Sequence, residues 1–77
     1  MSTMIDLHVI HADGQEADVT VNPGYSVYFL KMTVANAFGT DTNKTLVSLP
    51  DGTTMKRRRK VESYMLQSGD VIYSRVR

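Results

Sequence analysis

The sequence contains no cysteine. This absence excludes disulfide bonds, thiolate catalysis and zinc sites with cysteine ligands, and it is ordinary for an intracellular protein. No apolar run approaches the length of a signal peptide or a transmembrane helix. We therefore expect a soluble protein of the cytoplasm, the nucleus or both, with no insertion into a membrane.

Motifs for catalysis and for cofactors are missing as well. A turn or a helix end explains each of the five glycines, and no glycine-rich phosphate loop with its lysine is present. No serine lies in a nucleophile-elbow pattern. His8 and His11 would point to opposite faces of one strand, so they cannot chelate one metal ion, and we expect two exposed strand histidines. The sequence thus predicts no catalytic residue, no cofactor and no metal site, which argues against an enzyme.

One helix is expected between Ser26 and Gly39. Ser26 can accept hydrogen bonds from the first free amides, Gly39 tolerates the left-handed backbone that ends a helix, and no proline intervenes. At about 100° per residue, one face must be buried. The residues on it are Val27, Leu30, Val34, Ala37 and Phe38. Because one helix cannot cover this face by itself, the flanking strands should form a sheet against it.

The segments around the helix alternate as strands do. The first strand contains Ile5, Leu7 and Val9, the Asp-Gly pair at residues 13–14 favours a hairpin, and residues 17–21 form its second strand. After a polar connection at residues 40–43, we expect strands at 45–49, near 53–55 and at 71–76. A tight turn at residues 61–66 should pack on the core. This order predicts an α+β fold, β-β-α-β-β-β, with one helix packed on a mixed sheet in a single domain of residues 1–77.

These features resemble the ubiquitin family. From Ile5 to Gly39 the chain is similar to ubiquitin in its hairpin, in the Val-x-Pro sequence at residues 21–23, in the central helix lysine, Lys31, and in the terminal glycine. The segment from Tyr64 to Gln67 resembles the Tyr-Asn-Ile-Gln sequence near the end of ubiquitin. The resemblance covers nearly the whole chain and implies a ubiquitin-like β-grasp fold.

The spacing is also similar to that of the ubiquitin-fold modifier, from residues 29–31 through Phe38, Asp51-Gly52 and Ser68-Gly69. Ubiquitin-like modifiers resemble one another in ending with a glycine on a flexible tail, whose carboxylate the activating enzyme adenylates. The sequence ends at Arg77 while still in a strand pattern. Two alternatives follow: the chain is not conjugated, or the glycine-ended tail lies beyond Arg77 and is missing from this sequence.

The resemblance also places the positions of ubiquitin's apolar recognition patch. They fall at about Ala12, Ser48, Tyr73 and Arg75. A hydroxyl and a charge replace the large apolar centre, so receptors that bury that patch should not bind here. Since Gly52 resembles an insertion relative to ubiquitin, a slip of one residue would turn Val47 or Leu49 outward in place of Ser48.

Two other surfaces are candidates for binding. Tyr28, Phe29 and Met32 fall outside the buried helix face and could form an exposed apolar patch, unless the connection at residues 40–43 partly covers them. The second candidate is a run of five cations that cannot all be paired. This basic loop consists of Lys56, Arg57, Arg58, Arg59 and Lys60. It holds five of the nine basic residues, so the rest of the chain has four basic residues against eight acidic ones, a formal charge of −4.

The basic loop has three interpretations: a solvated loop with no specific partner, a site for nuclear targeting or an acidic protein, and a weak nucleic-acid site. Single-strand binders add stacking aromatics to such cations. We expect Tyr64 to be buried, which leaves Tyr73 as the aromatic side chain on which a nucleic-acid base could stack.

The function expected from the sequence is a non-enzymatic interaction module that binds a protein. We expect a monomer. A homodimer that forms through Tyr28, Phe29 and Met32 is the alternative within this interpretation. The alternatives are a ubiquitin-like modifier without its tail and a small basic nucleic-acid-binding domain.

Overall fold

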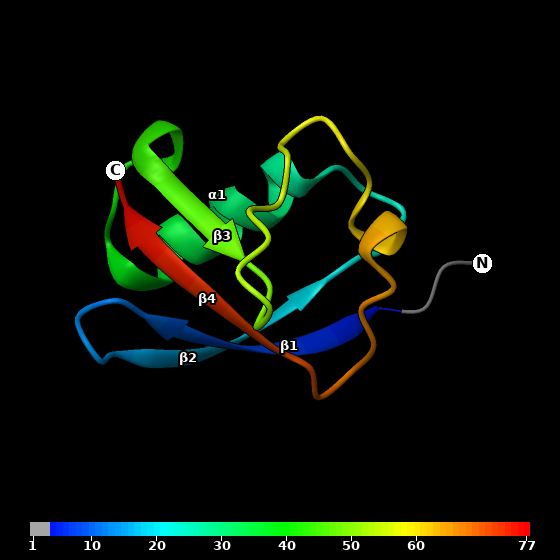
Figure 1. Cartoon of the computed structure of the whole chain (residues 1–77), viewed down its shortest axis with the longest axis horizontal. Coiled ribbons are helices and arrows are strands. Elements are labelled where there is room, and N and C mark those ends of the chain that lie inside the picture. Colours follow the sequence, from blue (N-terminus) through cyan, green and yellow to red (C-terminus); the bar gives the residue numbers. More distant parts are fainter. Residues whose placement is uncertain (1–3) are drawn as a thin grey trace.

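The computed structural model describes residues 4–77 and contains a four-stranded sheet with one helix against one face (Figure 1). The main elements are β1 (Ile5–His11), β2 (Glu16–Val21), α1 (Val27–Phe38), β3 (Thr45–Ser48) and β4 (Val71–Val76). Two short 3-10 helices, η1 (Thr42–Lys44) and η2 (Val61–Tyr64), complete the order. In this part of the chain no helix is long and apolar enough to cross a membrane. The predicted helix on a mixed sheet is confirmed.

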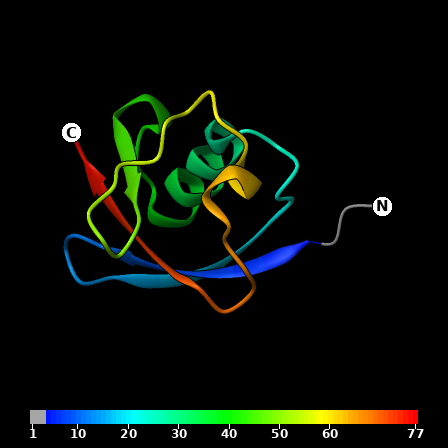
Figure 2. The same ribbon diagram turned by 45° about the vertical axis from the view of Figure 1, so that its right-hand side comes forward.

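The strands lie in the order β2-β1-β4-β3. β1 pairs antiparallel with β2 and parallel with β4, and β3 pairs antiparallel with β4. The predicted strand near residues 53–55 is wrong, because only an isolated bridge joins Thr54 to Ser48. The Met55 amide donates to the Val47 carbonyl at 2.9 Å, and the Met55 side chain is buried in the core. The chain then leaves the sheet edge toward the start of α1, so no ladder can extend (Figure 2).

The core lies between the sheet and α1. All four strands contribute buried side chains to it, such as Leu7, Val19, Val47 and Ile72. From the helix, the buried residues are Val27, Leu30, Lys31, Val34 and Ala35. Ala37, which the apolar pattern placed in this face, is exposed, and Phe38 is half-buried. The buried face is therefore turned toward Lys31, a residue that the apolar pattern could not include.

The two ends of α1 are stabilised differently. Gly39 has φ +70°, and its amide donates to the Ala35 carbonyl, which confirms the predicted left-handed end. Ser26 occupies the N-cap position, but its side chain makes no capping hydrogen bond, so that part of the prediction is wrong. The amides of the first two helical residues donate instead to carbonyls of the basic loop, at 2.7 Å to Arg59 and at 3.1 Å to Arg57. Backbone atoms far away in the sequence thus cap the helix.

Candidate interaction site

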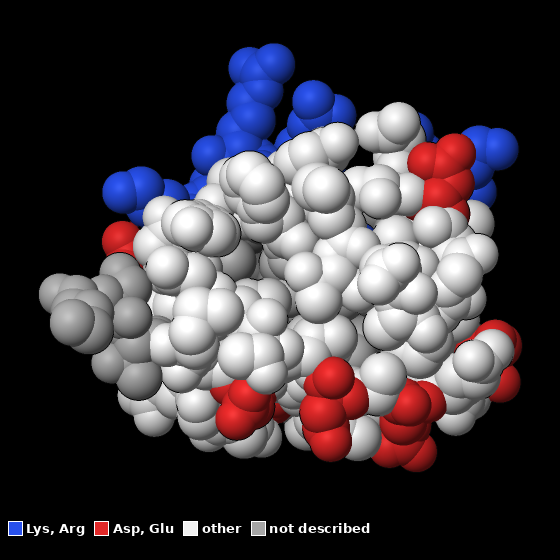
Figure 3. All heavy atoms as spheres, turned by 180° about the vertical axis from the view of Figure 1, so that it is seen from behind, with Lys and Arg blue, Asp and Glu red and all other residues white. Residues whose placement is uncertain are grey.

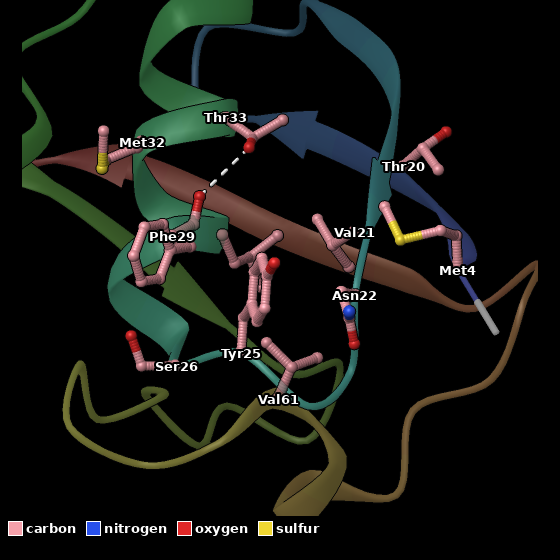
Figure 4. Close-up of a pocket in the computed structure, with 11 residues that line it drawn as sticks. Met4, Thr20, Val21, Asn22, Tyr25, Ser26, Phe29, Met32, Thr33 and Val61 are labelled. Atoms are coloured by element: carbon pink, nitrogen blue, oxygen red, sulfur yellow. Dashed lines mark hydrogen bonds between the residues drawn. The ribbon is translucent and has the colours of Figure 1, made fainter. Parts of the chain in front are cut away.

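A hollow of about 260 Å³ lies beside α1, and we call it the helix hollow (Figure 4). Phe29 and Met32 approach it from the helix, Tyr25 from the turn before the helix, and Val21 from β2. Met4 lines it from the start of β1. Within residues 4–77, every residue that lines it is uncharged. The hollow can therefore receive apolar side chains without desolvating a charged group.

The aromatic and methionine side chains of the helix hollow are open to solvent. The exposed fractions are 56% for Tyr25, 52% for Phe29 and 43% for Met32. The rings of Tyr25 and Phe29 lie 5.3 Å apart between centroids. An isolated exposed apolar residue is ordinary, but three large ones around one hollow form a patch of the kind that binding sites use.

The structure divides the surface predicted at Tyr28, Phe29 and Met32. Tyr28 is half-buried and faces the basic loop, with the guanidinium carbon of Arg57 at 5.6 Å from its ring centroid. Tyr25 joins Phe29 and Met32 in its place. The sequence analysis missed Tyr25 because this residue precedes the helix and has no place in the helical periodicity.

The basic loop is exposed at all five positions, as predicted for a solvated segment. It is nevertheless held in place. Its carbonyls cap α1, and the Lys56 amide donates to the Tyr64 hydroxyl at 2.7 Å. Arg59 lies over the Tyr64 ring with its guanidinium carbon 4.9 Å from the centroid. Since arginines cover the faces of the two tyrosines beside the loop, the loop presents guanidinium groups to solvent more than aromatic rings.

Charges are separated across the face of the molecule that carries α1. Figure 3 shows lysines and arginines gathered along one border of this face and most of the aspartates and glutamates along the opposite border, over the β1–β2 hairpin. A broad uncharged area lies between them. The helix hollow shares this uncharged character, since none of the described charged residues lines it.

The two histidines have different environments. His8 faces outward from β1, and its ring nitrogens lie 2.8 Å from Asp18 and 2.6 Å from Glu16. Hydrogen bonds to Asp18 and then to Glu16 raise the pKa of His8, because both carboxylates favour the imidazolium. Among residues 4–77, no group of three or more His, Cys, Asp or Glu side chains is placed to hold a metal ion.

His11 corrects the expectation of two exposed histidines, since its exposed fraction is 7%. Its Nδ1 lies 2.6 Å from the Ser74 hydroxyl, and its ring stacks on Phe38 with centroids 4.8 Å apart. β1 and β4 run side by side at His11 and Ser74, which explains the contact. No local signal marks it, because Ser74 is 63 residues away in the sequence.

Solved structures show which fold this arrangement belongs to. The ubiquitin-like domain of Dsk2 from Plasmodium falciparum superimposes with a TM-score of 0.90 at 17% sequence identity, covering 97% of this chain and 100% of that domain. The fold is the ubiquitin-like β-grasp. A designed protein based on ubiquitin superimposes with a TM-score of 0.86 at 18% identity, covering 96% of this chain and 89% of the design. No protein-family model and no curated protein matches the sequence.

On β3 and β4, the positions that correspond by resemblance to ubiquitin's recognition patch alternate with buried residues, so they lie on the sheet face away from α1. Ser48 pairs with Tyr73 across β3 and β4, and Leu46 pairs with Arg75. Val47 is fully buried, which excludes it from the outer face, whereas Ser48 and Leu49 are both half-buried. An open hollow of about 340 Å³ is lined by Ser48, Tyr73 and Arg75, and also by Ala12. Its lining combines polar groups of Ser48, Tyr73 and Arg75 with apolar side chains, which are those of Ile10, Ala12, Leu49 and Pro50.

Proposed function

We propose that this ubiquitin-like chain is a non-enzymatic protein-interaction module whose partner docks in the helix hollow. The observation that carries the proposal is the cluster of Tyr25, Phe29 and Met32, large side chains about half exposed around one uncharged depression. Aromatic residues and methionine are enriched in the centres of protein interfaces. Truncating such anchors usually costs more binding energy than any other change in an interface.

The charges beside the helix hollow specify the chemistry of the partner. The basic loop runs along the start of α1, where the carbonyls of Arg57 and Arg59 accept the hydrogen bonds of the cap, and it therefore borders the uncharged area. We propose a segment of another protein that places apolar side chains in the hollow and carboxylates beside the basic loop. Such complementarity speeds association and fixes the orientation of a bound segment.

The outer sheet face serves as the internal comparison. Tyr73 is 42% exposed there and Arg75 is exposed as well, but the paired position on β3 is a serine. An interface centred on this face would have to desolvate a guanidinium and a hydroxyl, which costs free energy unless the partner supplies matching groups. The helix hollow also has hydroxyl groups in its lining, but among the described residues it has no charged side chain that a partner would have to pair.

A displayed library of short random peptides, selected on the immobilised chain, tests the proposal. We expect enriched sequences with two or more large apolar residues and a cluster of Asp or Glu. Phe29→Ser should weaken their binding at least about tenfold, as expected for an aromatic anchor. Tyr73→Ser, which removes a similarly exposed aromatic from the outer sheet face, is the matched control and should change binding less than about twofold.

Amide NMR spectra of the free variants verify that both remain folded. Peptides that bind the Phe29→Ser variant as well as the parent, or that shift amides of β3 and β4 instead of α1, would contradict the proposal. A parent chain that forms dimers in sedimentation experiments, and loses them through Phe29→Ser, would replace the partner protein with a second copy of the chain.

A further inference from the structure

A second depression, the polar hollow, lies on another side of α1 and has a different composition. Its volume is about 110 Å³, and it lies between α1, η1, β3 and the basic loop. Three of its lining residues are cations: Lys31, Arg57 and Arg77. The other residues that line it, among those the structure describes, have neutral side chains. Three like charges around a small space repel one another unless an anion separates them.

Lys31 is the unusual member of this group. Only 9% of the residue is exposed, and its neighbours Leu30 and Val34 are fully buried. Within residues 4–77, the side-chain ion pairs are those of His8, and no hydrogen bond from the Lys31 ammonium is present. The buried part of Lys31 is its aliphatic stem: within residues 4–77 no side-chain nitrogen shut off from solvent lacks a hydrogen-bond partner, so the unpaired ammonium is open to the polar hollow that Lys31 lines.

The surroundings of Lys31 act against its charge. Burial lowers the pKa of the Lys31 ammonium, and the nearby charges of Arg57 and Arg77 lower it further. An anion in the polar hollow would oppose both arginine contributions at once and would supply the hydrogen-bond acceptors that Lys31 lacks.

The two arginines are held at the hollow by contacts of their own. Arg57 lies over the Tyr28 ring, and its carbonyl accepts a hydrogen bond from the Tyr28 amide at 3.1 Å. The Arg77 amide donates to the Lys44 carbonyl at 2.7 Å, which fixes the backbone beside η1. Prepositioned cations lose less conformational entropy when a ligand binds than free side chains do.

We propose that the polar hollow binds a phosphate group, with Lys31, Arg57 and Arg77 as its cations. Thr42 and Asn43 line the same hollow and can add hydroxyl and carboxamide donors. Arginine is suited to phosphate because its planar fork can donate two parallel hydrogen bonds to two oxygens. The small volume fits a single phosphate group. The site is separate from the helix hollow, so it stands or falls independently of the proposed protein interaction.

Amide NMR titration with sodium phosphate, at constant ionic strength against sodium chloride, tests the site on the parent chain. We expect saturable shifts at residues 28, 31, 42, 43 and 57. Lys31→Met keeps an unbranched buried side chain and removes the charge, and it should weaken phosphate binding at least about tenfold. Arg58→Met removes one charge from the same loop but outside the hollow, and it should weaken binding less than about twofold.

Equal losses in the two variants, or shifts that spread over residues 56–60 without saturation, would overturn the proposal in favour of diffuse attraction. If Lys31→Met does not fold, Arg57→Gln and Arg77→Gln replace it, since both side chains are exposed. The same titration with a phosphoserine peptide and its unphosphorylated twin identifies the source. Tighter binding of the phosphopeptide than of inorganic phosphate indicates a phosphorylated protein, and equal binding indicates a free phosphate ligand; either result requires the hollow.

Discussion

Leu30→Ala is the sharpest test of how α1 packs. Leu30 is fully buried in the core cluster between the helix and the sheet. Each lost carbon of the side chain is worth about 0.8 kcal/mol of transfer free energy, so the change costs about 2.4 kcal/mol before any cavity is counted. The cavity left behind raises the expected loss to about 2.7 to 5 kcal/mol, depending on how far the neighbours relax.

The free energy of unfolding should be measured with urea. The free energy of unfolding of a domain of this size is about 4 to 12 kcal/mol, so the expected loss is a large share of it. If the free energy of unfolding falls by about 1 kcal/mol per molar urea, the urea concentration at the unfolding midpoint should drop by about 2 M or more. Met32→Ala is the matched control, because Met32 lies on the same helix and is 43% exposed. A loss below about 0.5 kcal/mol for Leu30→Ala, or equal losses in both variants, would refute the assigned helix face.

Three further outcomes follow from the structure. Because both carboxylates raise the pKa of His8, its NMR titration midpoint should lie above the usual 6.5, and Asp18→Asn should lower it. The stabilisation from this cluster is fully present below the unfolded pKa and is lost as the pH rises through the folded pKa. Gly39→Ala should cost about 1 to 2 kcal/mol in urea denaturation, because φ +70° is unfavourable for a residue with a side chain. Oligonucleotide binding to the basic loop at about 50 mM salt should largely vanish near 200 mM in fluorescence anisotropy, since five cations release few counterions; sequence-selective, sub-micromolar binding at physiological salt would favour a nucleic-acid partner.

The strands and the helix could be predicted because their signals are local. Alternation in residues 5–11 and 17–21 and the glycine after Phe38 depend only on nearby residues, and these elements have the expected places. The strand expected near residues 53–55 is absent because a local pattern does not show how far a segment can pair with a neighbour, and this segment forms a single bridge, from Thr54 to Ser48. Periodicity alone also placed Ala37 in the core.

The misses at the candidate sites share a physical cause. Lys31, His11 and the cap of α1 all depend on contacts between segments far apart in the sequence. A lysine within an apolar helix pattern is normally assigned to solvent, and only the tertiary fold can bring Arg57 and Arg77 beside it. The residue types of the basic loop were visible in the sequence. The contacts that hold the loop in place, and the hydrogen bonds that its carbonyls accept at the start of α1, were not.

The periodicity of α1 makes the proposed tests separable. A helix turns about 100° per residue, so neighbouring residues face different surroundings. Leu30 faces the core, Phe29 faces the helix hollow, and Lys31 lines the polar hollow. Leu30→Ala, Phe29→Ser and Lys31→Met therefore each alter one face of the helix. A general defect in the helix would instead reduce stability, peptide binding and phosphate binding together. Loss of peptide binding in Phe29→Ser with phosphate binding retained, and the reverse in Lys31→Met, can arise only if the two hollows act as distinct sites.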